Sequence, residues 1–283
     1  MLTTTPITAA LGAVIDDVDL RPPISDELFA ELHAALLAHQ VVILRGQSLT
    51  DEEHQALGRR FGPLSIHPVS AAAGTNVTME WIEDGPDSPP KATRWHTDIS
   101  WLPAPPKIGL LSAQELPEAG ADTQWMSLKA AYRALSKPLQ DRLDGLVAVH
   151  DAGDNFFAQI EIGAGKVIAD KLRQLVQQSS EHPLVVAHPE TGDETLYFSP
   201  SNVTQIVGLH PAESRMLIGF LSELVDRPEL SMRWKWEVND LAIWDERYTL
   251  HRGIPDHYPA RRVMRRCTVD PGAPSAADDP THA

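Results

Sequence analysis

The sequence has very little cysteine, since Cys267 is the single one among 283 residues. A lone cysteine can form neither an intrachain disulfide nor a multi-cysteine metal cluster. The sequence has no apolar run near the roughly 20 residues that a membrane-spanning helix needs. Its first 20 residues also lack the basic segment that begins a secretory signal. We therefore expect a cytoplasmic protein with no membrane partner.

Basic residues are also scarce, with 24 Lys and Arg against 39 Asp and Glu and a formal net charge of −15. This charge excludes a general binder of nucleic acids or anionic membranes, because both are negatively charged. Hydrophobic residues make up 42% and charged residues 22% of the sequence, as in ordinary folded domains. Without repeats or linker-like segments, the sequence predicts a single domain over residues 1–269 and a disordered tail over residues 270–283.

The first part of the chain predicts two capped helices around a buried strand. Ser25 is well suited to cap a helix, and so is Thr50, which has Glu53 at the capping-box position. Between them, the apolar segment Val41–Gly46 is typical of a buried strand that ends at a glycine turn.

The remainder of the chain, from about residue 66, consists mostly of short strand candidates separated by loops rich in proline and glycine. Two helical segments interrupt them, at residues 127–143 and 211–226. We expect a mainly β fold with flanking helices. Closing an antiparallel sheet into a barrel or a double-sheet jelly roll would remove its exposed edges.

A candidate metal site lies in the segment that contains His96 and Asp98. In a strand, residues two apart point to the same face, so these side chains would offer one imidazole nitrogen and one carboxylate oxygen together. Such a pair suits a divalent first-row metal, although a His-x-Asp pair also occurs by chance. His251, late in an apolar strand region, is a candidate third ligand, and two histidines with one carboxylate form the facial triad of non-haem Fe(II) oxygenases.

Two other histidine–acid pairs are weaker candidates. His188 and Glu190 lie in a segment that predicts a hairpin turn, so we expect them to belong to a loop. His150 and Asp151 are adjacent, and adjacent residues of a strand point to opposite faces, which disfavours a joint site.

Two arginines near the C-terminus predict an anion site. Arg262, Met264 and Arg266 share one face of a predicted strand. If that face lines the interior, both guanidinium groups need anionic partners, which could be internal acids or an anionic ligand. A planar guanidinium matches a carboxylate or sulfonate well.

The sequence resembles the Fe(II)/2-oxoglutarate-dependent dioxygenases of the taurine dioxygenase and 2,4-dichlorophenoxyacetate dioxygenase (TauD/TfdA) family. The resemblance runs from about residue 12 to residue 269. It rests on the order of the segments VVILRGQ, RFGPLSIHPV, WHTDISW, LPEAGADTQW, AIWDERYTLHRG and PARRVMRRCTV, and on the eleven-residue step from His251 to Arg262. It implies a double-stranded β-helix (jelly-roll) core, a cupin-like arrangement that agrees with the strand pattern.

The resemblance also implies the cofactor and co-substrate sites. His96, Asp98 and His251 would bind Fe(II) and form the catalytic centre. Arg262 would pair with the distal carboxylate of 2-oxoglutarate, which Thr123 would support. O2 would be the second co-substrate. The reaction would hydroxylate a small organic anion while 2-oxoglutarate is decarboxylated to succinate and CO2, as in taurine catabolism.

For the primary substrate, the resemblance implies that Arg266 binds the acidic head group and that His67 lies in the same pocket. Phe156 falls where the family has an aromatic pocket wall, although simple core packing explains it equally well. The family is usually dimeric or tetrameric, so we expect a homo-oligomer. The loop at residues 69–93 is expected to cover the site and to become ordered with substrate.

Two departures from the taurine-specific pattern concern the substrate. Ser70 stands where that pattern has a tyrosine, and Ala92 where it has an asparagine. Both changes make the pocket less polar, which favours an alkyl sulfate or a sulfonate without an amine. A phenoxyalkanoate is the alternative within the family. Outside it, the same ligands could hold the Zn(II) of a hydrolase, or a jelly roll could bind a small anion without catalysis.

Overall fold

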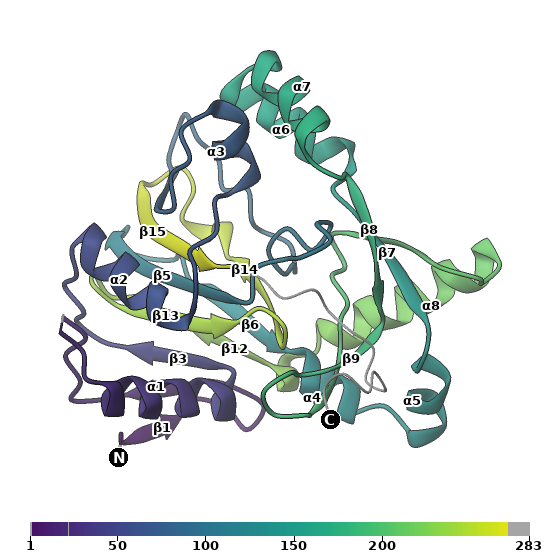
Figure 1. The fold of residues 1–283 in the computed structure, drawn as a ribbon, viewed down its shortest axis with the longest axis horizontal. Coiled ribbons are helices and arrows are strands. Elements are labelled where there is room, and N and C mark those ends of the chain that lie inside the picture. The colour runs from purple at the N-terminus through teal and green to yellow at the C-terminus, as the bar shows by residue number, and fades with distance from the viewer. Residues whose placement is uncertain (1, 22, 271–283) are drawn as a thin grey trace.

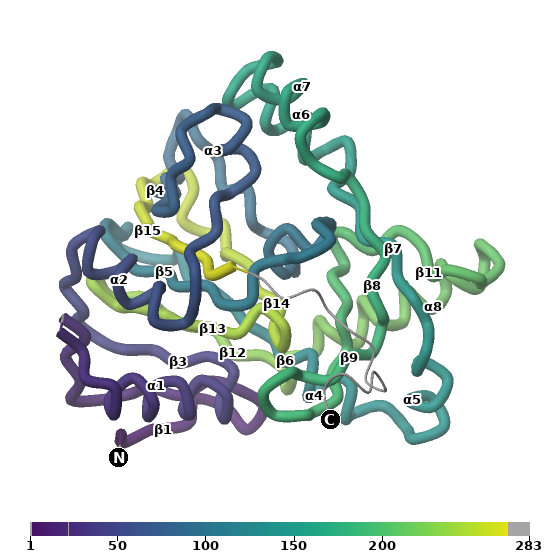
Figure 2. The backbone as a smooth tube through the Cα atoms, viewed as in Figure 1, coloured from purple at the N-terminus to yellow at the C-terminus, as the bar shows by residue number. Residues whose placement is uncertain are grey.

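The main sheet joins strands from both ends of the chain. The computed structural model describes residues 2–21 and 23–270. As Figure 2 shows, the late strands of the chain run beside strands of its first half. In spatial order, the seven strands of this sheet are β1 (Thr4–Pro6), β2 (Ala13–Ile15), β3 (Val41–Leu44), β13 (Leu241–Asp245), β5 (Ile108–Glu115), β15 (Arg262–Val269) and β4 (Glu80–Asp84).

Three smaller sheets complete the β structure. They consist of β12 (Ser231–Trp234), β6 (Thr123–Ser127) and β14 (Thr249–Gly253); of β11 (Val203–Ile206), β7 (Val147–Asp151) and β8 (Ser179–Pro183); and of β10 (Glu194–Leu196) and β9 (Val185–Ala187). The expectation of a mainly β fold with flanking helices is confirmed.

The helices lie around these sheets, as Figure 1 shows: α1 runs along the β1 and β3 side, whereas α6 and α7 form the opposite apex. They are α1 (Asp26–His39), α2 (Asp51–Phe61), α3 (Pro68–Ala73), α4 (Leu128–Arg133), α5 (Lys137–Leu143), α6 (Gly153–Ala164), α7 (Lys166–Leu175) and α8 (Pro211–Val225), with 3-10 turns at Pro228–Leu230 and Pro255–His257.

Both predicted helix caps are confirmed. The Ser25 hydroxyl accepts a hydrogen bond from the Leu28 N–H at 3.1 Å. Thr50 and Glu53 form the reciprocal capping box of α2, in which each side chain accepts from the other's backbone N–H. These bonds satisfy N–H groups that have no partner inside the helix, so they fix where α1 and α2 begin.

The apolar side chains of β3 alternate between two cores. Val42 and Leu44 face α1 and pack with its buried leucines, whereas Val41 and Ile43 face the three-stranded sheet that contains β6 and pack with its Trp125. The alternation follows from the two-residue period of a strand. The main sheet is therefore covered by helices on one face and by a second sheet on the other.

One helical prediction needs correction, and two helices were missed. The predicted single helical segment at residues 127–143 is two helices, α4 and α5, because Pro138 stands at the start of α5 and a proline is tolerated only in the first turn of a helix. The helices α6 and α7 were not predicted at all. On α6 several apolar residues are exposed, with Ile162 at 87% exposure, so the contrast between a buried and a solvent face is weak there. On α7 the buried residues Ala169 and Leu172 do lie on one face, and this helical spacing was overlooked.

The segment at residues 69–93, expected to be a loop, contains most of α3 and all of β4. This placement matters because β4 pairs with β15 and forms one edge of the main sheet. Beyond residue 270, the predicted tail lies outside the described residues. Within them, every helix is too short or too polar to cross a bilayer.

A glycine in β5 makes room for a buried tryptophan, and this contact predicts a stability effect. Gly109 lies opposite Trp244 on β13, and a Cβ atom at Gly109 would overlap the indole ring. Gly109→Ala should therefore lower the free energy of unfolding by about 1–3 kcal/mol, because the core cannot take the extra methyl group. Thermal unfolding measures the change.

The control is Gly219→Ala in α8, where an added Cβ would meet open space. This change should leave the melting temperature unchanged or raise it slightly, since alanine has the higher helix propensity. Equal melting temperatures for the two variants would contradict the tight contact at Gly109.

Candidate metal centre and anion sites

The structure brings His96, Asp98 and His251 together. One ligand atom from each lies within 4.8 Å of the others. Asp98 Oδ1 is 3.7 Å from His96 Nε2 and 3.8 Å from His251 Nε2. The two histidines are held side by side by their backbones, because each N–H donates to the other's carbonyl, at 3.1 and 2.8 Å. We call these three residues the His–Asp–His group.

The local conformation differs from the predicted strand. His96 forms an isolated bridge with His251, and the chain turns from Asp98 onward, where Ile99 has a φ of 42°. The simple two-residue alternation of a strand therefore does not orient Asp98. A turn directs its carboxylate back toward the histidines.

The donor set fits a divalent iron ion. The Nδ1 of His96 lies 2.7 Å from the Arg94 carbonyl, which can only accept, so Nδ1 donates there and Nε2 is the nitrogen left for a metal. Burial lowers the pKa of His251 to about 3, so this imidazole is neutral. Two imidazole nitrogens and one carboxylate oxygen form the set that non-haem Fe(II) enzymes use, with other coordination positions left open.

Asp98 is kept ionised by its neighbours. Burial alone would raise the pKa of this carboxyl, but Arg266, and then the two histidines of the group, hold it below its ordinary value. Arg266 Nη1 donates to Asp98 Oδ2 at 2.7 Å. One carboxylate oxygen is therefore committed to the arginine, and Oδ1 is the one that faces the histidines.

Glu246 is a site residue that the sequence analysis missed. Its buried carboxylate accepts hydrogen bonds from the Thr97 hydroxyl at 2.7 Å and the Asp98 N–H at 3.2 Å through Oε2, and from Trp244 Nε1 at 2.8 Å through Oε1. Burial, and then Asp98, raise the pKa of Glu246. Oε2 also lies 3.8 Å from His251 Nδ1, a buried atom with no hydrogen-bond partner among the described residues.

Glu246 thus joins the loop of Asp98 to the strand of Trp244. The sequence did contain a signal for Glu246. This acid directly follows an apolar strand and stands five residues before the candidate ligand His251, which places it near the predicted metal site. No periodicity rule could have shown that this acid turns inward.

Arg262 and Thr123 meet, as the resemblance implied. Arg262 Nε donates to the Ala121 carbonyl at 3.3 Å, and Nη2 donates to the Thr123 hydroxyl at 3.4 Å. The acid Asp84 is farther away, with Oδ2 3.6 Å from Arg262 Nη1. Burial lowers the pKa of Arg262, which indicates that its charge is only partly balanced by nearby groups.

Arg266 has closer partners. Besides Asp98, it donates through Nε and Nη2 to Oε2 of Glu80, at 3.0 and 2.8 Å. Burial opposes the charge of Arg266, but Asp98 and then Glu80 outweigh it and raise the pKa. His67, whose pKa is lowered by burial, has Nδ1 4.0 Å from Glu80 Oε1. His67 and Arg266 are thus gathered around an acid that was not predicted.

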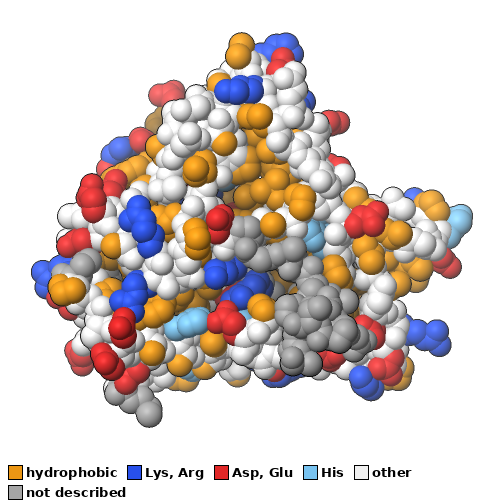
Figure 3. All heavy atoms as spheres, viewed as in Figure 1, with side chains coloured by type: hydrophobic (Ala, Val, Ile, Leu, Met, Phe, Trp, Pro, Cys, Tyr) orange, Lys and Arg blue, Asp and Glu red, His pale blue; other side chains and the backbone are white. Residues whose placement is uncertain are grey.

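Phe156 lies on α6 and packs against Trp101 and Phe157, with ring centroids 5.4 Å apart in both pairs. It belongs to an apolar cluster that α3, α6 and α7 share with Trp101. Figure 3 shows hydrophobic side chains gathered between α3 and the α6–α7 pair. These contacts are the core packing considered in the sequence analysis, and a role as a pocket wall stays a prediction.

The weaker histidine–acid pairs have structural partners. His188, in the hairpin between β9 and β10, lies 3.0 Å from a buried oxygen of Asp245. Glu190 bonds Arg247, and His150 bonds Ser100 at 3.0 Å. Neither pair forms a joint site, which agrees with the sequence analysis.

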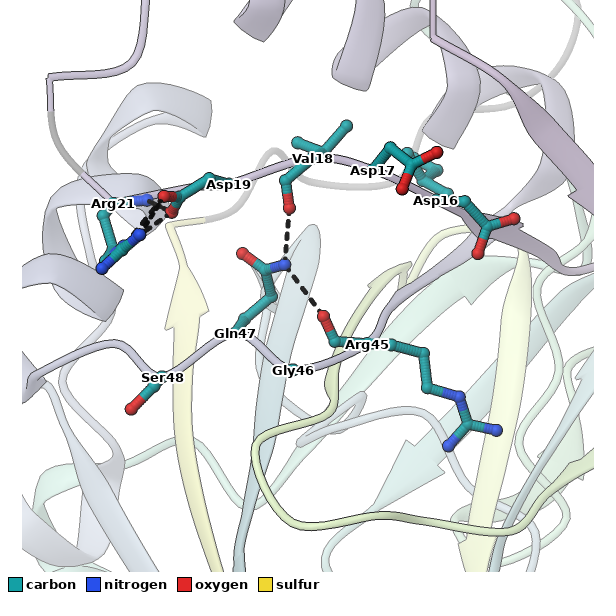
Figure 4. A pocket seen from close by; sticks show the side chains of 10 residues that line it. Asp16, Asp17, Val18, Asp19, Arg21, Arg45, Gly46, Gln47 and Ser48 are labelled. Carbon is teal, nitrogen blue, oxygen red and sulfur yellow. Dashed lines mark hydrogen bonds and ion pairs between the residues drawn. The ribbon is translucent and has the colours of Figure 1, made fainter.

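An open cleft of about 640 Å³ lies elsewhere, around the turn at Gly46. Figure 4 shows two sets of contacts among the lining residues: Gln47 donates to the carbonyls of Val18 and Arg45, and Asp19 pairs with Arg21. None of the predicted site residues lines this cleft. We therefore assign the chemistry to the His–Asp–His group.

Comparisons with known proteins agree with this assignment. Residues 3–268 match the family model described as "Taurine catabolism dioxygenase TauD, TfdA family". An alkylsulfatase of Acinetobacter baylyi is 34% identical, over 93% of this chain and 83% of that protein. An alpha-ketoglutarate-dependent sulfate ester dioxygenase of Pseudomonas putida is 32% identical, over 96% of this chain and 91% of that protein.

A solved structure gives the same result for the fold. The crystal structure of a taurine dioxygenase from Burkholderia xenovorans is 33% identical, covers 100% of this chain and 94% of its own, and superimposes with a TM-score of 0.82.

The geometry predicts that Asp98 is required for metal binding. Asp98→Ala should weaken the binding of Co(II) or Fe(II) by at least about 100-fold, because one of three ligands is lost, while the far-ultraviolet circular dichroism spectrum stays that of the wild type. Calorimetric titration with Co(II) measures the affinity.

Asp240→Asn is the matched control, because Asp240 is a buried carboxylate that bonds Arg45 and Trp234 rather than the His–Asp–His group. This variant should unfold at a lower temperature with its metal affinity intact. If Asp98→Ala bound Co(II) as tightly as the wild type, Asp98 would not be a ligand.

Proposed function

Because the chain belongs to the TauD, TfdA family of taurine catabolism dioxygenases, we propose that it hydroxylates an alkyl sulfate ester or an alkyl sulfonate without an amine. The chain is an Fe(II)/2-oxoglutarate-dependent dioxygenase, with Fe(II) as its metal and 2-oxoglutarate and O2 as co-substrates. When bound, they supply the oxidation that inserts one oxygen atom into a C–H bond and places the other in succinate, with release of CO2. If the hydroxylated carbon carries a sulfate, the product separates into an aldehyde and the free sulfate.

One observation carries the choice of substrate. Arg266 bonds the ligand residue Asp98 directly, so a head group held by Arg266 lies beside the metal, with its alkyl chain close to the reacting centre. Two relatives, 34% and 32% identical, are named as an alkylsulfatase and a sulfate ester dioxygenase, whereas an (S)-phenoxypropionate/alpha-ketoglutarate-dioxygenase is 31% identical. Ser70, where taurine-specific sequences have a tyrosine, bonds Thr75 and the Val77 N–H of its own turn. Its hydroxyl is thus not available for an ammonium group.

In this proposal the residues of the chain bind the metal and 2-oxoglutarate and orient them relative to each other. His96, Asp98 and His251 would hold the metal. Arg262 and Thr123 would hold the distal carboxylate of 2-oxoglutarate and so orient the co-substrate. Such positioning converts a reaction between separate molecules into one within a complex, which is the main contribution that a protein can make here.

Arg266 and His67 receive the anionic head group of the substrate, and the apolar cluster that includes Phe156 and Trp101 receives its alkyl chain. Glu246 keeps Asp98 in place through the backbone N–H of that residue. Apolar walls around the chain also keep water away from the reacting carbon.

We also propose a finer description of the fold. The main sheet and the sheet of β12, β6 and β14 pack face to face, and they carry Arg262 with Arg266 and Thr123 with His251, respectively. We infer that they form the two walls of a double-stranded β-helix in one domain over residues 1–269. A dimer or tetramer in the cytoplasm remains our expectation from the resemblance.

The first experiment titrates the Fe(II)-loaded protein with 2-oxoglutarate under anaerobic conditions. We expect a visible metal-to-ligand charge-transfer band, because the co-substrate chelates the metal. Succinate release is then measured with hexyl sulfate, hexanesulfonate and phenoxyacetate. Release with the sulfur compounds supports the proposal, release with phenoxyacetate alone favours the phenoxyalkanoate alternative, and hydrolysis without 2-oxoglutarate would point to a zinc hydrolase.

The two arginines should affect different substrates. Arg262→Ala should raise the KM for 2-oxoglutarate by about 100-fold or more, since truncating one partner of a buried charge pair costs about 2–5 kcal/mol. Arg266→Ala should instead raise the KM for the sulfate or sulfonate. Steady-state kinetics with each substrate varied in turn measure both effects, and an exchange of the two effects would reverse the assigned roles.

A further inference from the structure

Glu80 occupies the edge of Arg266 that is best suited to an anionic head group. The N–H bonds of Nε and Nη2 in a guanidinium are parallel, so they can donate hydrogen bonds to two oxygens of one anion. In the structure both nitrogens donate to a single oxygen, Oε2 of Glu80. The remaining nitrogen, Nη1, donates to Asp98.

The pairing follows from the sheet. Strand β4 runs antiparallel to β15 in a register that sets Glu80 opposite Arg266 and Asp84 opposite Arg262. Glu80, Ile82 and Asp84 share the more buried face of β4, whereas Trp81 and Glu83 are exposed. The strand thus presents one carboxylate to each of the two arginines.

The positive charge of Arg266 is already balanced by nearby acids, so it offers little attraction to a further anion. Two carboxylates already share one guanidinium, so an arriving head group would be the third negative group around a single cation. Asp98 cannot leave, because its other oxygen belongs to the His–Asp–His group. Glu80 is therefore the partner that an anionic substrate can replace.

Glu80 is also held in a way that allows exchange. Its Oε1 accepts no hydrogen bond from the described residues, and a quarter of its side chain, 25%, is exposed. Strand β4 is the edge strand of the sheet, so the displaced carboxylate can turn toward water without entering the core. A sulfate or sulfonate would give Nε and Nη2 one oxygen each, where Glu80 gives them a shared one.

We propose that Glu80 is a specificity-determining residue, which takes the place of the substrate's anionic head group on Arg266 until a head group able to form two hydrogen bonds with Nε and Nη2 displaces it. This inference rests on the proposed role of Arg266. It adds that a weakly binding anion cannot displace Glu80 from Arg266. The affinity for an anion therefore reflects the difference in free energy between its ion pair with Arg266 and that of Glu80.

The test compares Glu80→Gln with the wild type by calorimetry, on protein loaded with Fe(II) and 2-oxoglutarate under anaerobic conditions. The probes are hexyl sulfate and 1-hexanol, which share a chain and differ in charge. Since an uncharged amide is the weaker competitor, the Kd of hexyl sulfate should fall about tenfold, whereas that of 1-hexanol should change by less than about twofold. An unchanged or higher Kd for hexyl sulfate, or no binding of it to the variant, overturns the proposal.

Glu83→Gln is the matched control. It removes the same charge from the same strand, but Glu83 is exposed and pairs with Arg261 on the outer face. Its Kd for hexyl sulfate should stay within about twofold of the wild type, and a tenfold fall there would show that general charge, rather than displacement, governs binding. Glu80→Asp retains a competing carboxylate, so its Kd should stay closer to that of the wild type than that of Glu80→Gln, and the reverse order would count against the proposal.

Succinate release separates this inference from the proposed function. If hexyl sulfate binds more tightly to Glu80→Gln but neither protein oxidises it, displacement at Arg266 stands and the sulfate activity fails. If both proteins oxidise hexyl sulfate with equal Kd values, the activity stands and the role of Glu80 is wrong.

Discussion

The buried guanidinium of Arg266 is the constraint on which the rest of the site depends. A charge inside a protein is tolerated only with close counter-ions, and here they come from two distant segments, Glu80 on β4 and Asp98 in the loop after His96. Strand β4 must therefore lie beside β15, and the loop must cross to reach the same strand. With Oδ2 of Asp98 committed to the arginine, Oδ1 is left to face His96 and His251, so an electrostatic requirement of the sheet orients a metal ligand.

A second constraint acts from the other side of the same loop. Glu246 accepts hydrogen bonds from Thr97, Asp98 and Trp244, and Trp244 in turn packs closely against Gly109 in the next strand. The loop is thus fixed by a carboxylate that is itself fixed by core packing. A change in the packing of β5 against β13 would reach the metal ligands through these contacts, although it would touch none of them.

The sequence was sufficient to predict helices that begin with a capping residue, and site residues whose chemical type indicates a metal ligand or an anion partner. The caps at Ser25 and Thr50, the His–Asp–His group and the meeting of Arg262 with Thr123 were all predicted. The helix α6 was missed because exposed apolar residues such as Ile162 obscure its buried face, whereas α7 was missed although its buried residues lie on one face. Glu80 and Glu246 were missed for a different reason: an acid in a strand or after one is normally exposed, and only the register of β4 against β15 and the turn before His251 show that these two face inward.

The two arginines of β15 are balanced unequally, and this difference has a functional meaning within the proposed assignments. The Asp84 carboxylate stays 3.6 Å from Arg262, whereas Glu80 lies 2.8 Å from Arg266. Arg262 can therefore accept a carboxylate without first losing a close partner, and Arg266 cannot. On these assignments, the arginine of the co-substrate has no acid in close contact, whereas the arginine of the substrate is already paired with the protein's own Glu80. Discrimination among substrates then depends on how well a head group replaces Glu80, and the length of the alkyl chain contributes separately, through the apolar cluster between α3, α6 and α7.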